Sequence, residues 1–183
     1  MSEATTSIRP AAAPCDRGVV IITVSDRGAQ GLREDRSGAE LEAYLKDHGY
    51  PVRRRALVPD EIELIAGELR TAADQIGAGL ILTTGGTGVA PRDVTPEATL
   101  GVIDRSVPGM AEAMRAASLA KTPHAMLSRA VVGIRGRSLI VNLPGSPKGA
   151  LENLAALLPA LPHALAKIQG DPSDCAAVEG EKV

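Results

Sequence analysis

Aromatic side chains are almost missing from this sequence. Phe and Trp are absent, and the chain contains 2 tyrosines, Tyr44 and Tyr50. Proteins that bind single-stranded nucleic acid stack bases on aromatic platforms, which this chain lacks. The net charge is -2, so there is no overall basic field for a polyphosphate backbone. We therefore expect no nucleic-acid partner, and a heterocyclic ligand must be held by backbone groups, small side chains and hydrogen bonds.

Cysteines and long apolar runs are also scarce. The 2 cysteines, Cys15 and Cys175, lie in polar terminal segments where we expect little fixed geometry, and we interpret them as free thiols of a reducing compartment. Residues 1–17 have no uninterrupted apolar stretch like that of a signal peptide. The helical segment near the C-terminus is interrupted by Pro159 and Pro162, unlike a membrane span. We expect a cytoplasmic protein with no membrane association.

The chain has enough apolar residues for one sizeable core. Of its 183 residues, 44% are hydrophobic and 23% are charged, which is an ordinary globular composition. This length suits one domain. We predict a single domain over residues 18–170, between a flexible N-terminal tail at 1–17 and a C-terminal tail at 171–183, and we find no internal repeat.

Strand-like and helix-like segments alternate along this domain. Strands are predicted at 18–24, 52–58 and 79–84, and apolar runs at 130–134 and 138–143 suggest a hairpin or a kinked strand pair. Helices are predicted at 38–48 with Ser37 as N-cap, after Asp60, after Thr95 as N-cap, at 110–120, and in a C-terminal segment bent or split by its prolines. This alternation predicts an α/β fold, a Rossmann-like open and mostly parallel sheet with helices on both faces in three layers. Ligands should bind at the carboxyl ends of its strands.

The segment 83–99, TTGGTGVAPRDVTPEAT, carries the most informative chemical pattern. Gly85, Gly86 and Gly88 allow positive φ and close backbone approach, so successive N–H groups can point at a phosphate while Thr87 adds a hydroxyl. A plain tight turn between a strand and a helix would use the same glycines. The segment is neither a P-loop, because no Lys-Ser/Thr follows, nor a GxGxxG loop. Nucleotide binding here would need a different arrangement.

Further motifs accompany this segment along the chain. Together they are TVSDRGAQG, DRSG, VPDE, LILTTGGTGVAPRDVTPEAT, VPGMAEAMR, TPHAMLSR, GIRGRSLIVNLPGSPKG and LLPALPHAL. This combination resembles the molybdenum-cofactor biosynthesis family, whose members adenylylate molybdopterin. A look-alike branch has other residues in place of the Arg-Asp-Val-Thr-Pro found here at 92–96. The resemblance implies an enzyme, a nucleotidyltransferase that transfers AMP from Mg-ATP to the terminal phosphate of molybdopterin and releases pyrophosphate.

The resemblance assigns two carboxylates to catalysis and to Mg²⁺, those of Asp60 and Asp93. Hard oxygen ligands suit Mg²⁺, which takes one or two carboxylates plus phosphate oxygens and water. Without the resemblance, Asp60 would be interpreted as a simple helix N-cap. Asp26 matches an acidic position near the nucleotide, although an Asp in a charged loop is more often merely solvated.

The resemblance also implies two sets of binding residues. The nucleotide and phosphate set is Asp26, Gly85, Gly86, Thr87, Gly88, Asn142, Pro144, Gly145, Ser146 and Lys148. In this set Asn142 could bond a heterocycle edge and Lys148 a phosphate, but a plain β-turn with a solvated lysine explains them too. The pterin set is Ser118, Ser128 and Arg129, which could instead be a helix cap and a surface cation. His124 and His163 have no neighbours at metal-ligand spacing, so we expect packing or capping roles.

The resemblance further implies ATP as co-substrate, Mg²⁺ as cofactor, a homotrimer and a partner protein that inserts molybdate. Two other functions stay open. One is a non-catalytic pterin- or nucleotide-binding or scaffold module of the same fold, which would not need both Asp60 and Asp93. The other is a nucleotide-dependent hydrolase fused to such a fold, for which 183 residues leave no room.

Overall fold

Six strands form a single sheet in the order β2-β1-β3-β6-β5-β4. In the computed structural model, which describes residues 15–172, strands β2, β1, β3 and β6 run parallel, whereas β5 is antiparallel to both β6 and β4. The strands are β1 (Val19–Val24), β2 (Val52–Val58), β3 (Leu80–Thr84), β4 (Arg105–Ser106), β5 (Val132–Arg135) and β6 (Ser138–Leu143). The predicted mostly parallel sheet is confirmed, and the two apolar runs near its edge form a hairpin.

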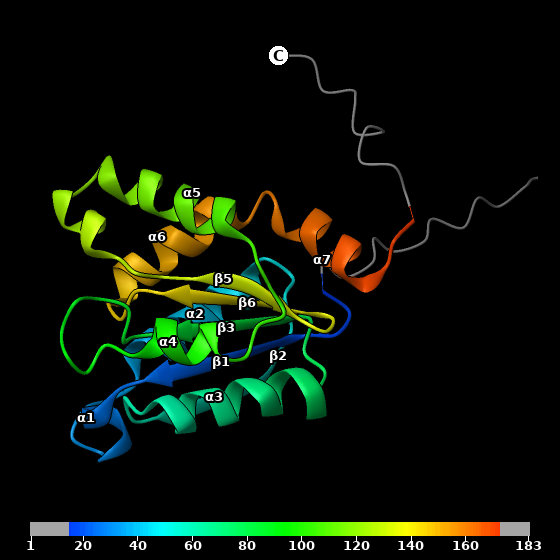
Figure 1. Cartoon of the computed structure of the whole chain (residues 1–183). Coiled ribbons are helices and arrows are strands. Elements are labelled where there is room, and N and C mark those ends of the chain that lie inside the picture. Colours follow the sequence, from blue (N-terminus) through cyan, green and yellow to red (C-terminus); the bar gives the residue numbers. More distant parts are fainter. Residues whose placement is uncertain (1–14, 173–183) are drawn as a thin grey trace, which may run out of the picture.

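Helices cover both faces of the sheet (Figure 1). One face carries α3 (Ile62–Arg70), its continuation η1 (Thr71–Gln75) and α4 (Thr95–Leu100). The other face carries α2 (Arg36–Asp47), α5 (Pro108–Leu119), α6 (Pro147–Leu157) and α7 (Leu161–Gln169). The single turn α1 (Asp26–Ala29) follows β1, and the 3-10 segment η2 (Pro123–Leu127) follows α5. The predicted three-layer α/β fold is confirmed, and the C-terminal helical segment is split between α6 and α7.

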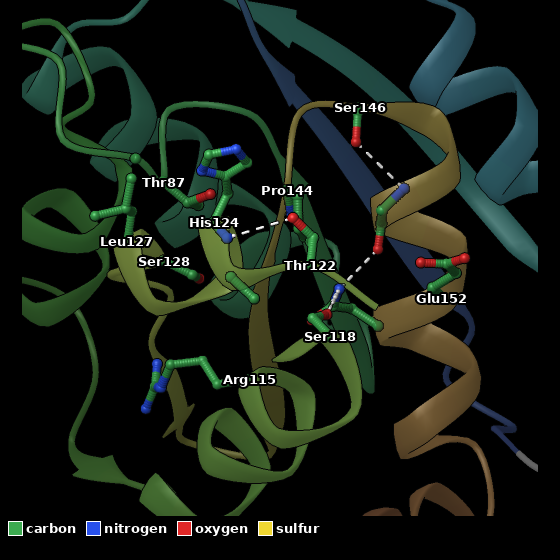
Figure 2. Close-up of a pocket in the computed structure, with 14 residues that line it drawn as sticks. Thr87, Arg115, Ser118, Thr122, His124, Leu127, Ser128, Pro144, Ser146 and Glu152 are labelled. Carbon is green, nitrogen blue, oxygen red and sulfur yellow. Dashed lines mark hydrogen bonds between the residues drawn. The ribbon is translucent and has the colours of Figure 1, made fainter. Parts of the chain in front are cut away.

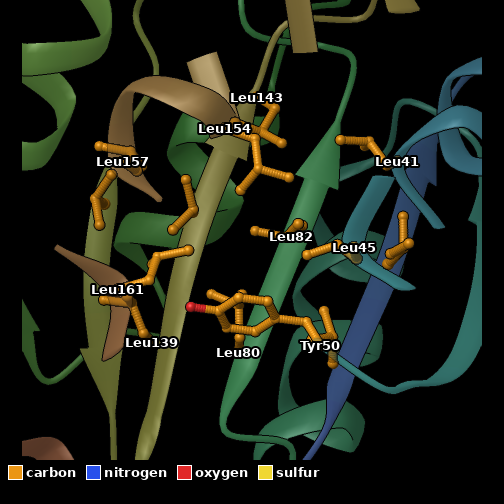
Figure 3. Close-up of a cluster of buried hydrophobic side chains, with 14 of the residues drawn as sticks. Leu41, Leu45, Tyr50, Leu80, Leu82, Leu139, Leu143, Leu154, Leu157 and Leu161 are labelled. Atoms are coloured by element: carbon orange, nitrogen blue, oxygen red, sulfur yellow. The ribbon is translucent and has the colours of Figure 1, made fainter. Parts of the chain in front are cut away.

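Alternate residues of the central strands enter two separate cores, one under each helical layer. The larger core takes Val19, Ile21, Leu80, Leu82, Leu139 and Val141, and packs them against α2, α5, α6 and α7 (Figure 3). The smaller core takes Val20, Ile22, Ile81 and Ile140, and packs them against α3 and α4. All of these strand residues are 0% exposed. Burial on both faces explains why these strands are continuous apolar runs without alternation.

Two helix starts differ from the sequence prediction. The N-cap of α2 is Asp35, whose Oδ1 accepts a hydrogen bond from the Gly38 N–H at 2.8 Å. The predicted cap, Ser37, instead shares a 2.7 Å hydrogen bond with the Thr84 hydroxyl. Thr95 lies inside α4, and its hydroxyl donates to the carbonyl of Gly85 at 2.9 Å. Both predicted capping hydroxyls therefore attach a helix to the end of β3.

Cys15 belongs to the folded core, so the expectation of little fixed geometry is wrong for this residue. Its side chain is 1% exposed, and the thiol donates a hydrogen bond to the carbonyl of Gly18 at 3.3 Å. Burial raises the pKa of this thiol. Cys175 lies outside the described residues. Among the residues from 15 to 172, no helix is long and apolar enough to cross a membrane.

The ends of β1, β3 and β6 approach each other closely at the carboxyl edge of the sheet. Gly85 follows β3 with φ +110°, and a Cβ added to it would lie 2.2 Å from the carbonyl oxygen of Val24. A Cβ added to Gly145, after β6, would lie 3.2 Å from the Gly85 Cα. Glycine at position 85 is therefore required twice, by its backbone conformation and by the space available.

We predict that Gly85→Ala destabilises the fold by roughly 2–5 kcal/mol, the sum of about 1–2 for left-handed backbone strain and about 1–3 for steric overlap. Gly31→Ala is the matched control, because Gly31 also has positive φ (+72°) but a Cβ there would meet nothing within 4 Å. The control should lose only the strain contribution. Urea unfolding of both variants measures the difference, and equal losses would contradict the close approach at Gly85.

Candidate active site

Two cavities lie at the carboxyl edge of the sheet and share Ser146 as a common wall residue. The first, which we call the edge cavity, has a volume of about 470 Å³ and is lined by segments that follow β1, β2, β3 and β6. The second, the helical cavity, has a volume of about 300 Å³ and is lined by α5, η2 and α6 together with the loops after β3 and β6. The glycine-rich loop is divided between them. Gly85 and Gly86 line the edge cavity, whereas Thr87 and Gly88 line the helical cavity.

The edge cavity contains five of the sequence-predicted site residues, Asp60, Gly85, Gly86, Gly145 and Ser146. It lies beside β1, where the strand order reverses: the connection from β1 to β2 runs to one side of β1, and the connection from β2 to β3 returns to the other side. Such a topological switch point is where open α/β sheets bind ligands.

The edge cavity also contains two arginines and a serine that the sequence analysis did not assign to the site. Arg33, Arg36 and Ser37 line it from the segment between α1 and the first turn of α2. The α6 N-terminus is at the same cavity, because its N-cap Ser146 and first residue Pro147 are lining residues. Glu34 and Asp35 also line the cavity, and Asp35 is paired with Arg55 at 2.7 Å. The two helix N-termini and the two arginines are the lining groups that suit an anionic ligand such as a phosphate chain. The charged residues of the segment SDRGAQGLREDRSG were the sequence signal that could have assigned Arg33 and Arg36 to the site.

Asp60 lines the edge cavity and does not cap a helix. The N-cap position of α3 is Glu61, so the capping interpretation of Asp60 is wrong. Asp60 and Asp26 instead form a reciprocal pair. The Asp26 N–H donates to Asp60 Oδ2 at 2.8 Å, and the Asp60 N–H donates to Asp26 Oδ1 at 3.0 Å. Partial burial raises the pKa of Asp60, and the nearby carboxylates of Asp26 and Asp93 raise it further.

Asp26 is held by an arginine and lines neither cavity. Arg92 grips its carboxylate with two hydrogen bonds, from Nε to Oδ2 at 2.9 Å and from Nη2 to Oδ1 at 2.7 Å. Hydrogen bonding to Arg92 lowers the pKa of Asp26, so this carboxyl group stays ionised. Both oxygens of Asp26 are therefore used by protein donors.

Asp93 and Arg129 border a shallow hollow beside the glycine-rich loop, outside both cavities. The Asp93 carboxylate accepts a 2.8 Å hydrogen bond from the Ala90 N–H. The Arg129 guanidinium donates to the carbonyl of Gly88 at 2.6 Å, to the carbonyl of Asp93, and to the Glu97 carboxylate. Arg129 was predicted to contact the pterin. In the structure it lies outside the helical cavity and holds the glycine-rich loop from the other side.

The helical cavity contains the other two residues predicted for the pterin side, Ser118 and Ser128 (Figure 2). The Ser118 hydroxyl accepts a 3.0 Å hydrogen bond from the amide of Asn153 on α6. Arg115, one helical turn before Ser118 on α5, also lines the cavity, and its position at i−3 was the signal that sequence reasoning missed. His124 is a further lining residue, although it was expected to serve only packing or capping.

Asn142 and Lys148 lie outside both cavities. Asn142 is 0% exposed, its amide N–H₂ donates to the hydroxyls of Thr83 and Thr99, and its amide oxygen accepts from the Val131 N–H. The predicted contact with a heterocycle edge is therefore replaced by internal hydrogen bonds. Lys148 lines a separate open groove between α2 and α6. Pro144 lines the helical cavity and not the edge cavity.

Comparisons with known proteins identify the family of this chain. A gephyrin from Dictyostelium discoideum is 44% identical over 164 residues, which is 84% of this chain but 23% of that protein, so the chain spans less than a quarter of its length. A molybdopterin adenylyltransferase from Helicobacter pylori strain J99 is 42% identical and covers 82% of this chain and 87% of its own.

The solved structures include the molybdopterin biosynthesis enzyme MoaB from Thermus thermophilus, which superposes with a TM-score of 0.80 at 54% identity. The alignment covers 85% of this chain and 98% of that one. The family described as "probable molybdopterin binding domain" matches residues 20–163, a range that includes every residue lining the two cavities. The chain therefore belongs to the molybdopterin-binding domain family of molybdenum-cofactor biosynthesis proteins.

Proposed function

We propose that this chain is a molybdopterin adenylyltransferase, which transfers AMP from Mg-ATP to the terminal phosphate of molybdopterin and releases pyrophosphate. The observation that carries this proposal is the pair of cavities on a common wall, because a two-substrate transfer needs two sites whose reacting groups meet. The Helicobacter pylori relative with this activity in its name supports the assignment across most of the chain.

ATP would occupy the edge cavity. Its phosphates would face the backbone of Gly85 and Gly86 and the N-terminus of α6, while Arg33 and Arg36 offset their charge. A volume of about 470 Å³ lies within the range of small-molecule and cofactor sites. Asp26 would act on this site only through its hydrogen bonds with Asp60, and Lys148 lies in the neighbouring groove, which shares Arg36 and Pro147 with the edge cavity.

Molybdopterin would occupy the helical cavity, with Ser118, Ser128 and His124 as hydrogen-bonding groups. Thr87 and Gly88 belong to the wall between the cavities, and Ser146 lines both cavities. The terminal phosphate of molybdopterin would therefore meet ATP near Ser146. In the reaction, an oxygen of that phosphate attacks the α-phosphorus of ATP. The bond from the α-phosphorus to the bridging oxygen breaks, and pyrophosphate leaves with that oxygen. Positioning and charge neutralisation do most of the work in such transfers.

The residues present fit Mg²⁺. The Asp60 and Asp93 carboxylates both border the glycine-rich loop, because a Cβ added to Gly86 would lie 3.0 Å from Asp60 Oδ1 and one added to Gly88 would lie 2.8 Å from Asp93 Oδ2. No group of three or more His, Cys, Asp or Glu that could hold a metal occurs within residues 15–172. In proteins Mg²⁺ usually takes one or two carboxylates, and its other ligands are phosphate oxygens and water. When bound, Mg²⁺ would neutralise phosphate charge. Asp60 would hold it, and Asp93 is proposed as the second carboxylate.

We further propose a cytoplasmic homotrimer that hands its product to a molybdate-inserting protein. The family resemblance supports each of these statements. Apolar side chains left on the surface, among them those of Leu100, Leu119 and Met126, are available for contacts between copies of the chain.

Asp60→Asn and Asp93→Asn should each lower the turnover of AMP transfer by roughly a hundredfold or more, because each removes a carboxylate charge needed in the transition state. Stability should barely change, because an Asn side-chain oxygen can still accept the N–H of Asp26 or of Ala90. Steady-state formation of adenylyl-molybdopterin and thermal unfolding measure the two effects.

The double variant of Asp60 and Asp93 should lose less than the product of the two single losses, since residues that act on one ion are not additive. Wild-type turnover in both single variants would overturn the catalytic assignment and favour the non-catalytic binding module.

Ser128→Ala should weaken molybdopterin binding more than ATP binding, because Ser128 lines only the helical cavity. Arg129→Ala should act differently and lower the thermal stability, because the carbonyls of Gly88 and Asp93 lose the hydrogen bonds that Arg129 donates to them. Titration calorimetry with each ligand, together with thermal unfolding, separates these effects. Equal losses for both ligands in Ser128→Ala would mean that the two cavities are wrongly assigned.

The mass in solution should be about three times the 18.9 kDa of one chain. Light scattering at micromolar concentration measures it directly. A mass near 18.9 kDa would exclude the trimer.

A further inference from the structure

We propose that Arg92 is a positioning residue for the transfer reaction, which acts through Asp26 to orient the Asp60 carboxylate. This inference rests on the proposed function, because it assigns a role within the same site. Arg92 directly precedes Asp93 in the sequence, but its side chain contacts Asp26 and through it supports Asp60.

The first step is the contact between Arg92 and Asp26. The guanidinium uses Nε and Nη2, and the carboxylate uses both oxygens, which is the bidentate geometry that arginine offers and lysine does not. The side chains are 60% and 33% exposed, so their direct contribution to stability is small. What this pair contributes is therefore mainly the position in which it holds the Asp26 carboxylate.

The second step is the contact between Asp26 and Asp60. Each residue donates its backbone N–H to the carboxylate of the other, at 2.8 and 3.0 Å. The Asp26 oxygen that accepts from the Asp60 N–H, Oδ1, is the oxygen that Arg92 Nη2 holds. Arg92 thereby orients the Asp26 carboxylate, and that carboxylate fixes the backbone of Asp60.

The third step is the orientation of the Asp60 carboxylate that results from these contacts. Its Oδ2 is used by the Asp26 N–H, whereas Oδ1 lies 3.0 Å from where a Cβ on Gly86 would be. The carboxylate is thus aimed at the glycine-rich wall of the edge cavity. Arg92 and Asp26 line neither cavity, so they influence the site through Asp60 and not by touching the ligands.

The anchoring of the loop between β3 and α4 supports the same role. Arg129 holds one side of this loop through Gly88 and Asp93, while Arg92 attaches its other side to α1. The loop that separates the two cavities is therefore fixed at both sides. Loss of Arg92 would leave Asp26 without its partner and the loop held at one side only.

The test is a double-mutant cycle with Arg92→Gln, Asp26→Asn and the double variant. Each single variant should lower kcat for AMP transfer by roughly ten- to a hundredfold, which is typical of residues that orient a ligating group. KM for ATP should stay within about twofold, because the cavity lining is intact. The double variant should be no slower than the slower single variant, because both changes break one chain of contacts.

Binding provides a readout that does not depend on turnover. Calorimetry with Mg-ATP in the absence of molybdopterin should give a Kd within about threefold of wild type for Arg92→Gln, as expected for a residue that does not touch the nucleotide. A loss of tenfold or more would make Arg92 a direct phosphate ligand and overturn the proposal.

The matched control is the pair Arg135 and Asp74, in which a half-buried arginine holds an exposed aspartate with two nitrogens and also donates to the carbonyl of Val102. It lies at the opposite end of the sheet, beside the start of β6. Arg135→Gln and Asp74→Asn should keep wild-type kcat even if urea unfolding shows lower stability, which separates an effect on the site from an effect on folding.

Besides that loss of Mg-ATP affinity, three kinetic results would overturn the role of Arg92. They are wild-type kcat in both single variants, losses that multiply in the double variant, and an equal loss of kcat in the Arg135→Gln control. If the wild-type protein itself forms no adenylylated pterin, the proposed function fails, and the role of Arg92 fails with it. An active wild type with multiplying losses overturns the role of Arg92 alone.

Discussion

The close approach of three backbone segments at the carboxyl edge of the sheet determines the rest of the site. A Cβ at Gly85 would overlap the carbonyl of Val24, and a Cβ at Gly145 would press on Gly85. Because no side chains intervene, the loops after β1, β3 and β6 meet and form one thin wall. The hydroxyl of Thr95 holds Gly85 in this position, and the hydroxyl of Thr84 does the same for Pro144. One cavity can then open on each side of the wall.

The polar residues after the glycines hold this wall in place. Arg92 pairs with Asp26, Asp93 accepts from the Ala90 N–H, and Glu97 pairs with Arg129. Together these contacts explain how a loop of ten residues between β3 and α4 has a defined shape. Much of the Arg-Asp-Val-Thr-Pro-Glu motif is thus architecture for the site. A ligand would meet mainly the backbone that the motif supports, and fixed backbone donors stabilise phosphate charge without rearrangement.

The two cavities differ in a way that suits two different ligands. The edge cavity is bordered by donors that suit an anion, namely Arg33, Arg36 and the starts of α2 and α6, and also by the carboxylates of Glu34, Asp35 and Asp60. The helical cavity is bordered by hydroxyls, His124 and apolar side chains such as Leu127. The edge cavity would suit an anionic phosphate chain, and the helical cavity would suit a flat heterocycle with polar edges.

The sequence by itself determined the main strands and helices, and it predicted the kind of site. Buried parallel strands are recognisable as apolar runs, and glycines beside capped helices indicate a backbone-built anion site, because these signals are local. Only the tertiary structure decided how the site residues divide. Asn142 turned inward to Thr83 and Thr99, Arg129 turned to the outer side of the loop, and Asp60 paired with Asp26. Such contacts join residues 34 to 66 positions apart, the longest being that between Asp26 and Arg92, and they depend on which strand ends the sheet brings together.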